Sequence, residues 1–273
     1  MTGIYLFVKN RIISPLVRIS RIDTVVEPLP YRMFELRLAK FLRNPTSERI
    51  IEHPWTIKWL ERESNGKILD IGCGDEALLT TYLISKGYDA YGIDLLDTNR
   101  LSKDRFYKRD VTKTGIESET FGTILLVSTL EHIGSKDEDF ETMEESYRLL
   151  KKDGLILLSS PFCKDYEWRG QRFFSRERIY QLSKKFEIIE DSFHLLNGAI
   201  WYKVGYKDAE EHTKDYKGPH SIAIMSVVLN KKTQARRDLN SRSPAPQADA
   251  LIQSRLRAYT YWMQQLEYKI KYR

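Results

Sequence analysis

Cysteine and long apolar stretches are both scarce in this 273-residue sequence. The two cysteines, Cys73 and Cys163, are too few for a disulfide framework, so a reducing cytoplasm is the expected location. No apolar run approaches the roughly eighteen residues that a membrane-spanning helix requires. Basic residues interrupt the N-terminal apolar stretch, which argues against a cleavable signal peptide. We therefore expect a globular protein that does not cross a membrane.

Acidic residues are absent from residues 1–22, and the net charge of +6 is unevenly distributed. Residues 1–50 hold nine Lys or Arg against four Asp or Glu, and residues 231–273 hold ten against three. Residues 51–230, with 25 basic and 31 acidic side chains, are net acidic. The two basic ends therefore need an interpretation separate from that of the acidic middle.

The N-terminal end, residues 1–45, is interpreted as a basic helical arm. Apolar and basic residues alternate over residues 4–21, which is typical of an amphipathic helix on an anionic membrane surface. Pro15 interrupts this helix. The alternative is that the arm packs on the rest of the domain or on a second subunit.

The C-terminal end has coiled-coil spacing. Residues 233–250 lack a hydrophobic period and are interpreted as a linker. Residues 251–273 are predicted to form an amphipathic helix that is short for an independent coiled coil, so dimerisation or docking on another domain would have to assist it. Its basic side chains leave a membrane-surface role open. The apolar seam is Ile252, Leu256, Tyr259, Met263, Leu266 and Ile270.

Two glycines in the middle of the chain mark a predicted turn between a strand and a helix. Residues 67–71 (KILDI) are a short branched-apolar run, as expected of a strand buried in a parallel sheet. Gly72 and Gly74 lack a Cβ, so a ligand can lie against their backbone. Asp75 is then placed to cap a helix that ends at Gly87. The free N–H groups of such a helix start favour a carboxylate ligand.

A second strand is predicted over residues 88–95, and Asp94 lies near its end, twenty residues after Gly74. An acid at this place holds ribose hydroxyls in nucleotide-binding folds. The third glycine of the dinucleotide fingerprint is missing, because Leu78 lies near its place. A mononucleoside with a carboxylate tail therefore fits this pattern better than a dinucleotide does.

Further motifs follow in order, namely RDV at 109–111, TILLVSTLEHI at 123–133 and LLKKDGLILLSSP at 149–161. Together with ILDIGCG and GIDL, they resemble the class I S-adenosylmethionine-dependent methyltransferases over residues 50–230. The strongest resemblance is to a small-molecule branch with Leu-Glu-His after the fourth strand. It implies a Rossmann-like α/β fold, in which a seven-stranded mixed sheet of order 3-2-1-4-5-7-6, with strand seven antiparallel, carries helices on both faces.

The resemblance implies S-adenosylmethionine as cofactor and S-adenosylhomocysteine as product. Asp70 would hold the methionine end, Asp94 the ribose and Asp110 the adenine amino group, with a backbone N–H from Val111. The alternative for Asp110 is an acid in a surface turn. The full set of implied cofactor-binding residues is Asp70, Gly72, Cys73, Gly74, Asp94, Leu95, Asp110, Val111 and Ser128.

His132 and Glu131 are the candidate catalytic residues. Methyl transfer is an in-line displacement, so the site mainly aligns donor and acceptor. If the acceptor is a hydroxyl, its proton must leave, and a histidine such as His132 suits that role. Alternatively, both residues cap the next helix or frame the cofactor pocket. Some relatives bind a divalent ion through Glu-x-x-Glu-His, but Ser128 replaces the first Glu here, so no metal is expected.

Acceptor binding is assigned to a polar, aromatic loop at residues 161–174, with a long connection at 195–220 as a lid. The alternatives are a plain connector with buried aromatics and a surface loop. The candidate acceptor contacts are Tyr166, Trp168, Arg169, Arg172 and Trp201.

We therefore predict a methyltransferase domain over residues 46–232 that methylates an oxygen of a small-molecule, sugar or lipid-linked glycan acceptor. The basic ends leave peripheral contact with the inner membrane face, or a homodimer, as expected partners. One alternative is a nucleic-acid methyltransferase, although an Asn/Asp-Pro-Pro-Tyr motif is missing. The other is a non-enzymatic scaffold, against which the intact cofactor motifs count.

Overall fold

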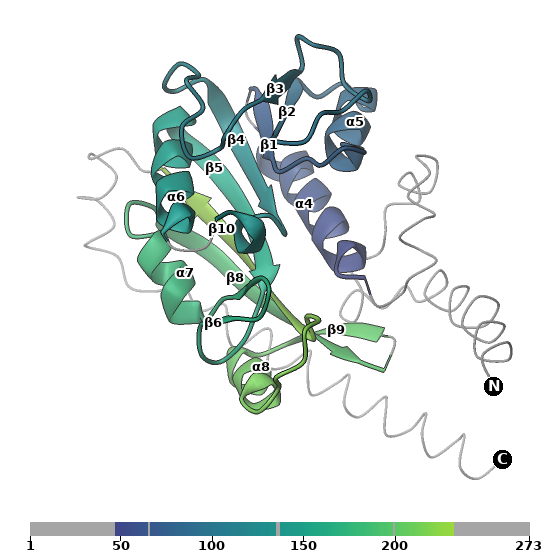
Figure 1. Cartoon of the computed structure of the whole chain (residues 1–273), viewed down its shortest axis with the longest axis vertical. Helices are drawn as coiled ribbons and strands as arrows, with labels where there is room; N and C mark the ends of the chain where they lie inside the picture. The colour runs from purple at the N-terminus through teal and green to yellow at the C-terminus, as the bar shows by residue number, and fades with distance from the viewer. Residues whose placement is uncertain (1–46, 65, 135–136, 199, 232–273) are drawn as a thin grey trace, which may run out of the picture. The chain divides into compact units, whose positions relative to one another are not determined.

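The structure is a computed structural model that describes residues 47–231 except 65, 135–136 and 199 (Figure 1). The predicted N-terminal arm, the linker and the C-terminal helix lie outside the described residues. Within the described part of the chain, no helix is long and apolar enough to cross a membrane.

A mixed sheet runs through the described fold, with strand order β3-β2-β1-β4-β5-β10-β8-β9 (Figure 1). Strands β1 to β5 pair in parallel, and β10 pairs antiparallel with both β5 and β8. This confirms the predicted order and the antiparallel seventh strand, which is β10. Strand β9 pairs antiparallel with β8 and adds an edge that the prediction lacked. The strands are β1 Ile68–Ile71, β2 Ala90–Asp94, β3 Phe106–Lys108, β4 Phe121–Val127, β5 Leu150–Pro161, β8 Glu187–Asn197, β9 Ile200–Val204 and β10 Ala223–Asn230.

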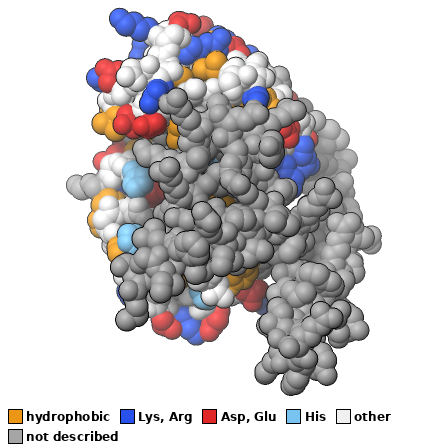
Figure 2. All heavy atoms as spheres, turned by 90° about the vertical axis from the view of Figure 1, so that its right-hand side faces the viewer, with side chains coloured by type: hydrophobic (Ala, Val, Ile, Leu, Met, Phe, Trp, Pro, Cys, Tyr) orange, Lys and Arg blue, Asp and Glu red, His pale blue; other side chains and the backbone are white. Residues whose placement is uncertain are grey.

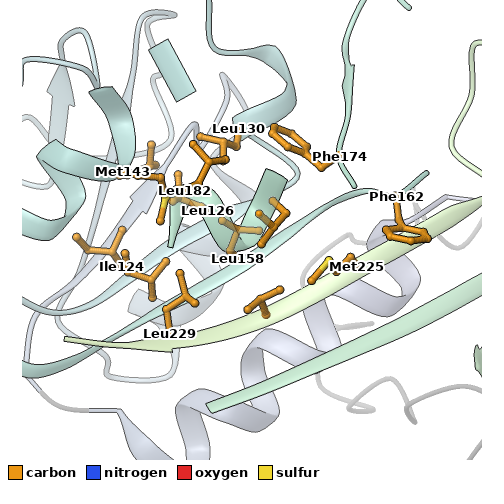
Figure 3. Close-up of a cluster of buried hydrophobic side chains, with 14 of the residues drawn as sticks. Ile124, Leu126, Leu130, Met143, Leu158, Phe162, Phe174, Leu182, Met225 and Leu229 are labelled. Carbon is orange, nitrogen blue, oxygen red and sulfur yellow. The ribbon is translucent and has the colours of Figure 1, made fainter. Parts of the chain in front are cut away.

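Helices cover both faces of the sheet, as predicted. Alternate residues of β4 are buried on opposite faces, because successive strand side chains point to opposite sides. Ile124 and Leu126 pack in a cluster with side chains of α6 and α7 (Figure 3), whereas Leu125 and Val127 pack with those of α4 and α5. The helices are α4 Arg49–Glu63, α5 Leu78–Ser85, α6 Glu138–Leu149, α7 Arg176–Leu182 and α8 Tyr206–Thr213.

The predicted start of the helix after the glycine loop is wrong. The helix after the glycine loop begins at Leu78, and the residue before it is Ala77 in a left-handed conformation (φ 41°) without a side-chain cap, so Asp75 is not the N-cap. Ala77 is fully buried, and its amide donates a hydrogen bond of 3.3 Å to the Gly74 carbonyl, which closes a turn before the helix. Helix α4 contains Pro54 as its sixth residue. Proline has no N–H to donate to the Ile50 carbonyl, so the helix lacks one backbone hydrogen bond at this position.

The long connection at residues 195–220 forms regular structure, namely the end of β8, strand β9 and helix α8. Trp201 is almost fully buried in a cluster with Ile50, Ile51 and Ile224. The connection thus extends the sheet edge and contributes a core side chain. A contact of Trp201 with an acceptor, as predicted from the sequence, is not compatible with this burial.

The loop between β5 and α7 contains a small hairpin, β6 Glu167–Trp168 and β7 Arg172–Phe173. After it, the Ser175 hydroxyl accepts a hydrogen bond from the Arg178 amide and caps α7. On the face shown in Figure 2, acidic and basic side chains of the described residues are interspersed.

Candidate active site

A cavity of about 490 Å³ opens at the carboxyl ends of β1 and β4, the edge at which open α/β sheets bind ligands. Four of the sequence-predicted cofactor residues line it together, namely Asp70, Gly72, Cys73 and Gly74. The remaining lining residues come from α4 and the segment before it, from the glycine loop and α5, and from β4: Ser47, Arg49, His53, Asp75, Glu76, Leu78, Leu79 and Val127.

The two glycines of the loop have different tasks. Both have a left-handed backbone, with φ of 71° at Gly72 and 69° at Gly74. A Cβ on Gly72 would lie 2.3 Å from the Thr129 Cγ2 atom, so Gly72 permits the close approach of the loops after β1 and β4. A Cβ on Gly74 would meet no atom of the described part of the chain within 4 Å. Gly74 therefore leaves open space for a ligand beside the backbone.

Asp94 ties this loop to the end of β2. Its Oδ2 atom accepts a hydrogen bond of 2.8 Å from the Gly74 amide, and its Oδ1 atom accepts one of 2.8 Å from the Leu96 amide. A carboxylate has about four lone-pair sites, so both oxygens retain acceptor capacity. Leu95, the next predicted cofactor residue, is exposed beside this acid.

Asp70 is a buried carboxyl group in the cavity wall, with 4% of the residue exposed. The Thr80 hydroxyl donates a hydrogen bond of 2.6 Å to its Oδ2 atom. Burial raises the pKa of Asp70 to about 6, although the bond from Thr80 opposes this rise. An ammonium group bound beside Asp70 would favour the ionised carboxylate.

Asp110 lies just beyond β3 and is exposed. Its Oδ1 atom accepts hydrogen bonds from the Thr112 amide (2.9 Å) and the Thr112 hydroxyl (2.8 Å). This is the surface-turn arrangement that was the alternative interpretation for this residue. Val111, which follows it, is buried.

Ser128, Glu131 and His132 lie together after β4, on the short 3₁₀ helix η3 (Leu130–His132) and the turn before it. Ser128 has a left-handed backbone (φ 49°), and its hydroxyl donates a hydrogen bond of 2.6 Å to the Glu131 Oε1 atom. The Glu131 Oε2 atom is buried and has no hydrogen-bond partner among the residues that the structure describes. Burial raises the pKa of Glu131 to about 8. This carboxyl group is therefore mostly protonated at pH 7.

His132 presents its imidazole to solvent, with 58% of the side chain exposed. Its Nε2 atom lies 3.9 Å from the Glu131 Oε1 atom, which is too far for a hydrogen bond. Partial burial, and then the positive charge of Arg49, lower the pKa of His132 below its ordinary value. The imidazole is consequently neutral at pH 7 and able to accept a proton.

A polar network that the sequence analysis did not identify lies beside this turn. The Arg49 Nη1 atom lies 2.6 Å from the Glu52 Oε2 atom and donates a hydrogen bond of 3.3 Å to the Val127 carbonyl. The Ser159 hydroxyl donates a hydrogen bond of 2.8 Å to the other oxygen of Glu52, which is fully buried. One sequence signal was available, because Glu52 is an acid inside the otherwise apolar start of α4.

The predicted acceptor residues of the hairpin separate into exposed and buried ones. Tyr166 and Trp168 are exposed, and 52% of Trp168 is accessible. Arg169 pairs with Glu167 at 2.8 Å. Arg172 is completely buried, so the predicted direct contact between Arg172 and an acceptor is wrong.

No group of three or more His, Cys, Asp or Glu side chains among the described residues is arranged to hold a metal ion. The strand order, the glycine loop after β1 and the acid at the end of β2 together define a class I S-adenosylmethionine-dependent methyltransferase. A family model described as a methyltransferase domain matches residues 38–188, more than half of the chain, and the chain belongs to this family.

Individual proteins resemble the chain over part of its length or at low identity. YqeM of Bacillus subtilis (strain 168), which is named as a methyltransferase, is 28% identical over 115 residues that cover 38% of this chain and 46% of YqeM. The chain thus matches about half the length of this curated relative.

Solved structures also resemble it. The N-methyltransferase NodS from Bradyrhizobium japonicum is 12% identical (TM-score 0.49, covering 79% of this chain and 95% of NodS). A S-adenosylmethionine-dependent methyltransferase from Methanosarcina mazei is 16% identical (TM-score 0.49, 66% and 98%).

The cavity fits the cofactor of this class, S-adenosylmethionine. Gly74 leaves open space beside the loop, and the Asp70 carboxyl group in the cavity wall suits the amino group of the methionine end. The Arg49 guanidinium also lines the cavity and is a cation with which a carboxylate group could pair.

Proposed function

We propose that this methyltransferase transfers the methyl group to an oxygen atom of a small-molecule, sugar or lipid-linked glycan acceptor, with His132 as the base. One observation carries the proposal, namely an accessible imidazole with a lowered pKa in the turn that follows β4, whose last residue, Val127, lines the cavity. A base must be unprotonated before it acts, and His132 meets this condition at neutral pH.

We assign the cofactor contacts as follows. Asp70 binds the amino group of the methionine end, and the backbone of Gly72, Cys73 and Gly74 forms the floor beneath it. Asp94 accepts hydrogen bonds from the ribose hydroxyls through its remaining lone pairs. Asp110 binds the adenine amino group, and Val111 contributes its backbone N–H. The side chains of Leu95 and Ser128 are further contacts with the cofactor.

The chemistry assigned to the protein is alignment and proton removal. The bound cofactor supplies an electrophilic methyl group. His132 accepts the hydroxyl proton of the acceptor as the O–C bond forms and the C–S bond breaks, and its exposed ring then releases the proton to solvent. Because Glu131 is mostly protonated at pH 7, it does not hold His132 as a charged partner.

The acceptor is assigned to the exposed aromatic side chains of the loop before α7. Trp168 and Tyr166 offer flat, partly apolar faces with a polar edge, which suit the apolar face of a sugar ring. Glu131, which accepts a hydrogen bond from Ser128 and lies next to His132 in the chain, is assigned to shaping the acceptor side of the pocket.

The basic ends of the chain are assigned to attachment of the protein to a membrane surface. We infer from their charge that residues 1–50 and 231–273 bring the enzyme to an anionic membrane surface, where a lipid-linked acceptor would lie. Sedimentation with anionic vesicles tests this inference. Binding that is equal with neutral vesicles, or a stable dimer without vesicle binding, would contradict it.

The proposed function is tested by transfer of labelled methyl from S-adenosylmethionine into a host extract that is separated into lipid, carbohydrate, nucleic-acid and protein fractions. The wild type is compared with His132→Ala after both are shown to bind S-adenosylhomocysteine. Label in lipid or carbohydrate, bound through oxygen and lost in the variant, is the expected result. Label in nucleic acid, label on nitrogen or full activity of the variant would overturn the proposal.

A further inference from the structure

Arg172 is a buried cation that reaches the turn carrying Glu131 and His132. It belongs to β7, and its side chain is fully buried. Its Nη1 atom lies 3.4 Å from the Leu130 carbonyl oxygen and donates a closer hydrogen bond to the Ile133 carbonyl. These two carbonyl groups flank Glu131 and His132 in the sequence. A residue 40 positions away therefore holds both ends of the turn.

The charge of Arg172 is balanced on its other side. Asp139 lies 3.9 Å from its Nε atom and Glu138 lies 3.7 Å from its Nη2 atom. Asp139 is itself buried and accepts three hydrogen bonds from Arg178, at 2.8, 2.9 and 3.2 Å. A buried charge without such partners would be strongly destabilising. The acids at the start of α6 thus keep the guanidinium in place.

Inside the turn, a side-chain hydrogen bond from Ser128 to Glu131 accompanies a few backbone hydrogen bonds. The turn contains a three-residue 3₁₀ helix without a side-chain cap, preceded by the left-handed Ser128. Its internal backbone hydrogen bonds join the His132 amide to the Thr129 carbonyl (2.9 Å) and the Ile133 amide to the Leu130 carbonyl (3.5 Å). The planar, multi-donor guanidinium suits the task of bridging two carbonyl groups, which an ammonium group does poorly.

We infer that Arg172 is a positioning residue for methyl transfer, which holds the Leu130 and Ile133 carbonyl groups and thereby fixes the direction in which His132 faces the acceptor. The same guanidinium lies 5.7 Å from the Trp168 ring. Arg172 thus links the exposed hairpin to the turn. The inference rests on the proposed function only for the role of His132 as base, because the effect of Arg172 on the turn does not depend on the reaction.

The test follows the titration of His132 by NMR in the full chain, beside the label-transfer assay. The ring signal of His132 is assigned by its loss in His132→Gln. Burial holds the pKa of His53 and of His194 at about 3, so neither signal interferes near neutral pH. Arg49 and Glu131 are the charged or titratable groups that act on His132.

In Arg172→Met, we expect the His132 titration to move upward, toward the ordinary value of 6.5, because a released turn exposes the ring further. We also expect a fall in label transfer of roughly 10- to 100-fold, as misplaced catalytic groups produce. Affinity for S-adenosylhomocysteine should stay within about twofold of the wild-type value. The hydrogen bonds and ion pairs of Arg172 described above involve none of the cavity-lining residues.

Arg178→Met is the matched control, because it removes a second arginine from Asp139 without touching the turn. Its His132 titration should equal that of the wild type. Arg172→Lys keeps the charge beside Asp139 and serves if the methionine variant does not fold. An unchanged titration and transfer rate in folded Arg172 variants, or an equal shift in Arg178→Met, would overturn the inference. Full activity of His132→Ala would instead overturn the proposed base and leave the titration result standing.

Discussion

The Gly74 amide donates a hydrogen bond of 2.8 Å to the Asp94 carboxylate, which joins the loop after β1 to the end of β2. The other Asp94 oxygen accepts from the Leu96 amide, so one side chain orders both segments. A ligand that contacts both the glycine loop and the end of β2 therefore meets a preformed site.

Asp94→Ala should weaken binding of S-adenosylhomocysteine by about tenfold or more, because hydrogen bonds to a charged group contribute roughly 1.5–3 kcal/mol. Isothermal titration calorimetry measures the affinity. The control is Asp97→Ala, which removes an exposed acid from its pair with Lys108 nearby. Equal affinity of Asp94→Ala and the wild type would show that Asp94 does not organise the site.

Gly72→Ala should destabilise the fold more than Gly74→Ala does. Both variants place a side chain in a left-handed conformation, which costs roughly 1–2 kcal/mol, but only the Gly72 Cβ would clash with Thr129. Thermal unfolding measures the difference.

Gly87→Ala provides the control for Gly74→Ala, since Gly87 is also left-handed and faces open space. The two variants should lose similar stability, yet only Gly74→Ala should lose affinity for S-adenosylhomocysteine. Equal affinity in both would show that the open space beside Gly74 does not hold the ligand.

Glu131 should make the stability of the protein depend on pH. Its folded pKa of about 8 lies above the ordinary value of 4.5, so the unfolded chain releases the proton at lower pH than the folded protein does. Its contribution to stability is fully present below pH 4.5 and is lost as the pH rises through 8, with a slope of up to about 1.4 kcal/mol per pH unit.

Glu131→Gln should remove this slope while keeping an acceptor for the Ser128 hydroxyl. Urea unfolding at pH 5 and pH 8 measures it, and the variant should gain stability relative to the wild type only at the higher pH. A constant difference between the two proteins at both pH values would contradict the raised pKa.

Trp168→Ala should change stability by less than about 0.5 kcal/mol, as expected for a surface substitution, while reducing label transfer. Ile189→Ala on β8 is the control, because Ile189 is also an exposed apolar side chain and belongs to none of the proposed contacts. If both variants retain full transfer, the hairpin does not contact the acceptor.

The sequence determined much of the cofactor half of the enzyme, because that half depends on local patterns. A branched-apolar run followed by Gly72 and Gly74 predicts a buried strand and an open turn within a few residues. The acid at the end of β2 and the apolar run of β4 come next in the sequence, at the spacing typical of the family. The strand order was predicted from the resemblance to that family. Asp70, Gly72, Cys73 and Gly74 accordingly meet in one cavity.

The tertiary structure alone decided which charged side chains are buried and what they bind. Arg172 was predicted to meet an acceptor, but two carbonyl groups and the acids at the start of α6 enclose it. Glu52 meets Ser159 across 107 positions of sequence, and no local period signals such a contact. Burying a charge requires partners that only the folded chain brings together, so its role cannot be predicted from the surrounding residues.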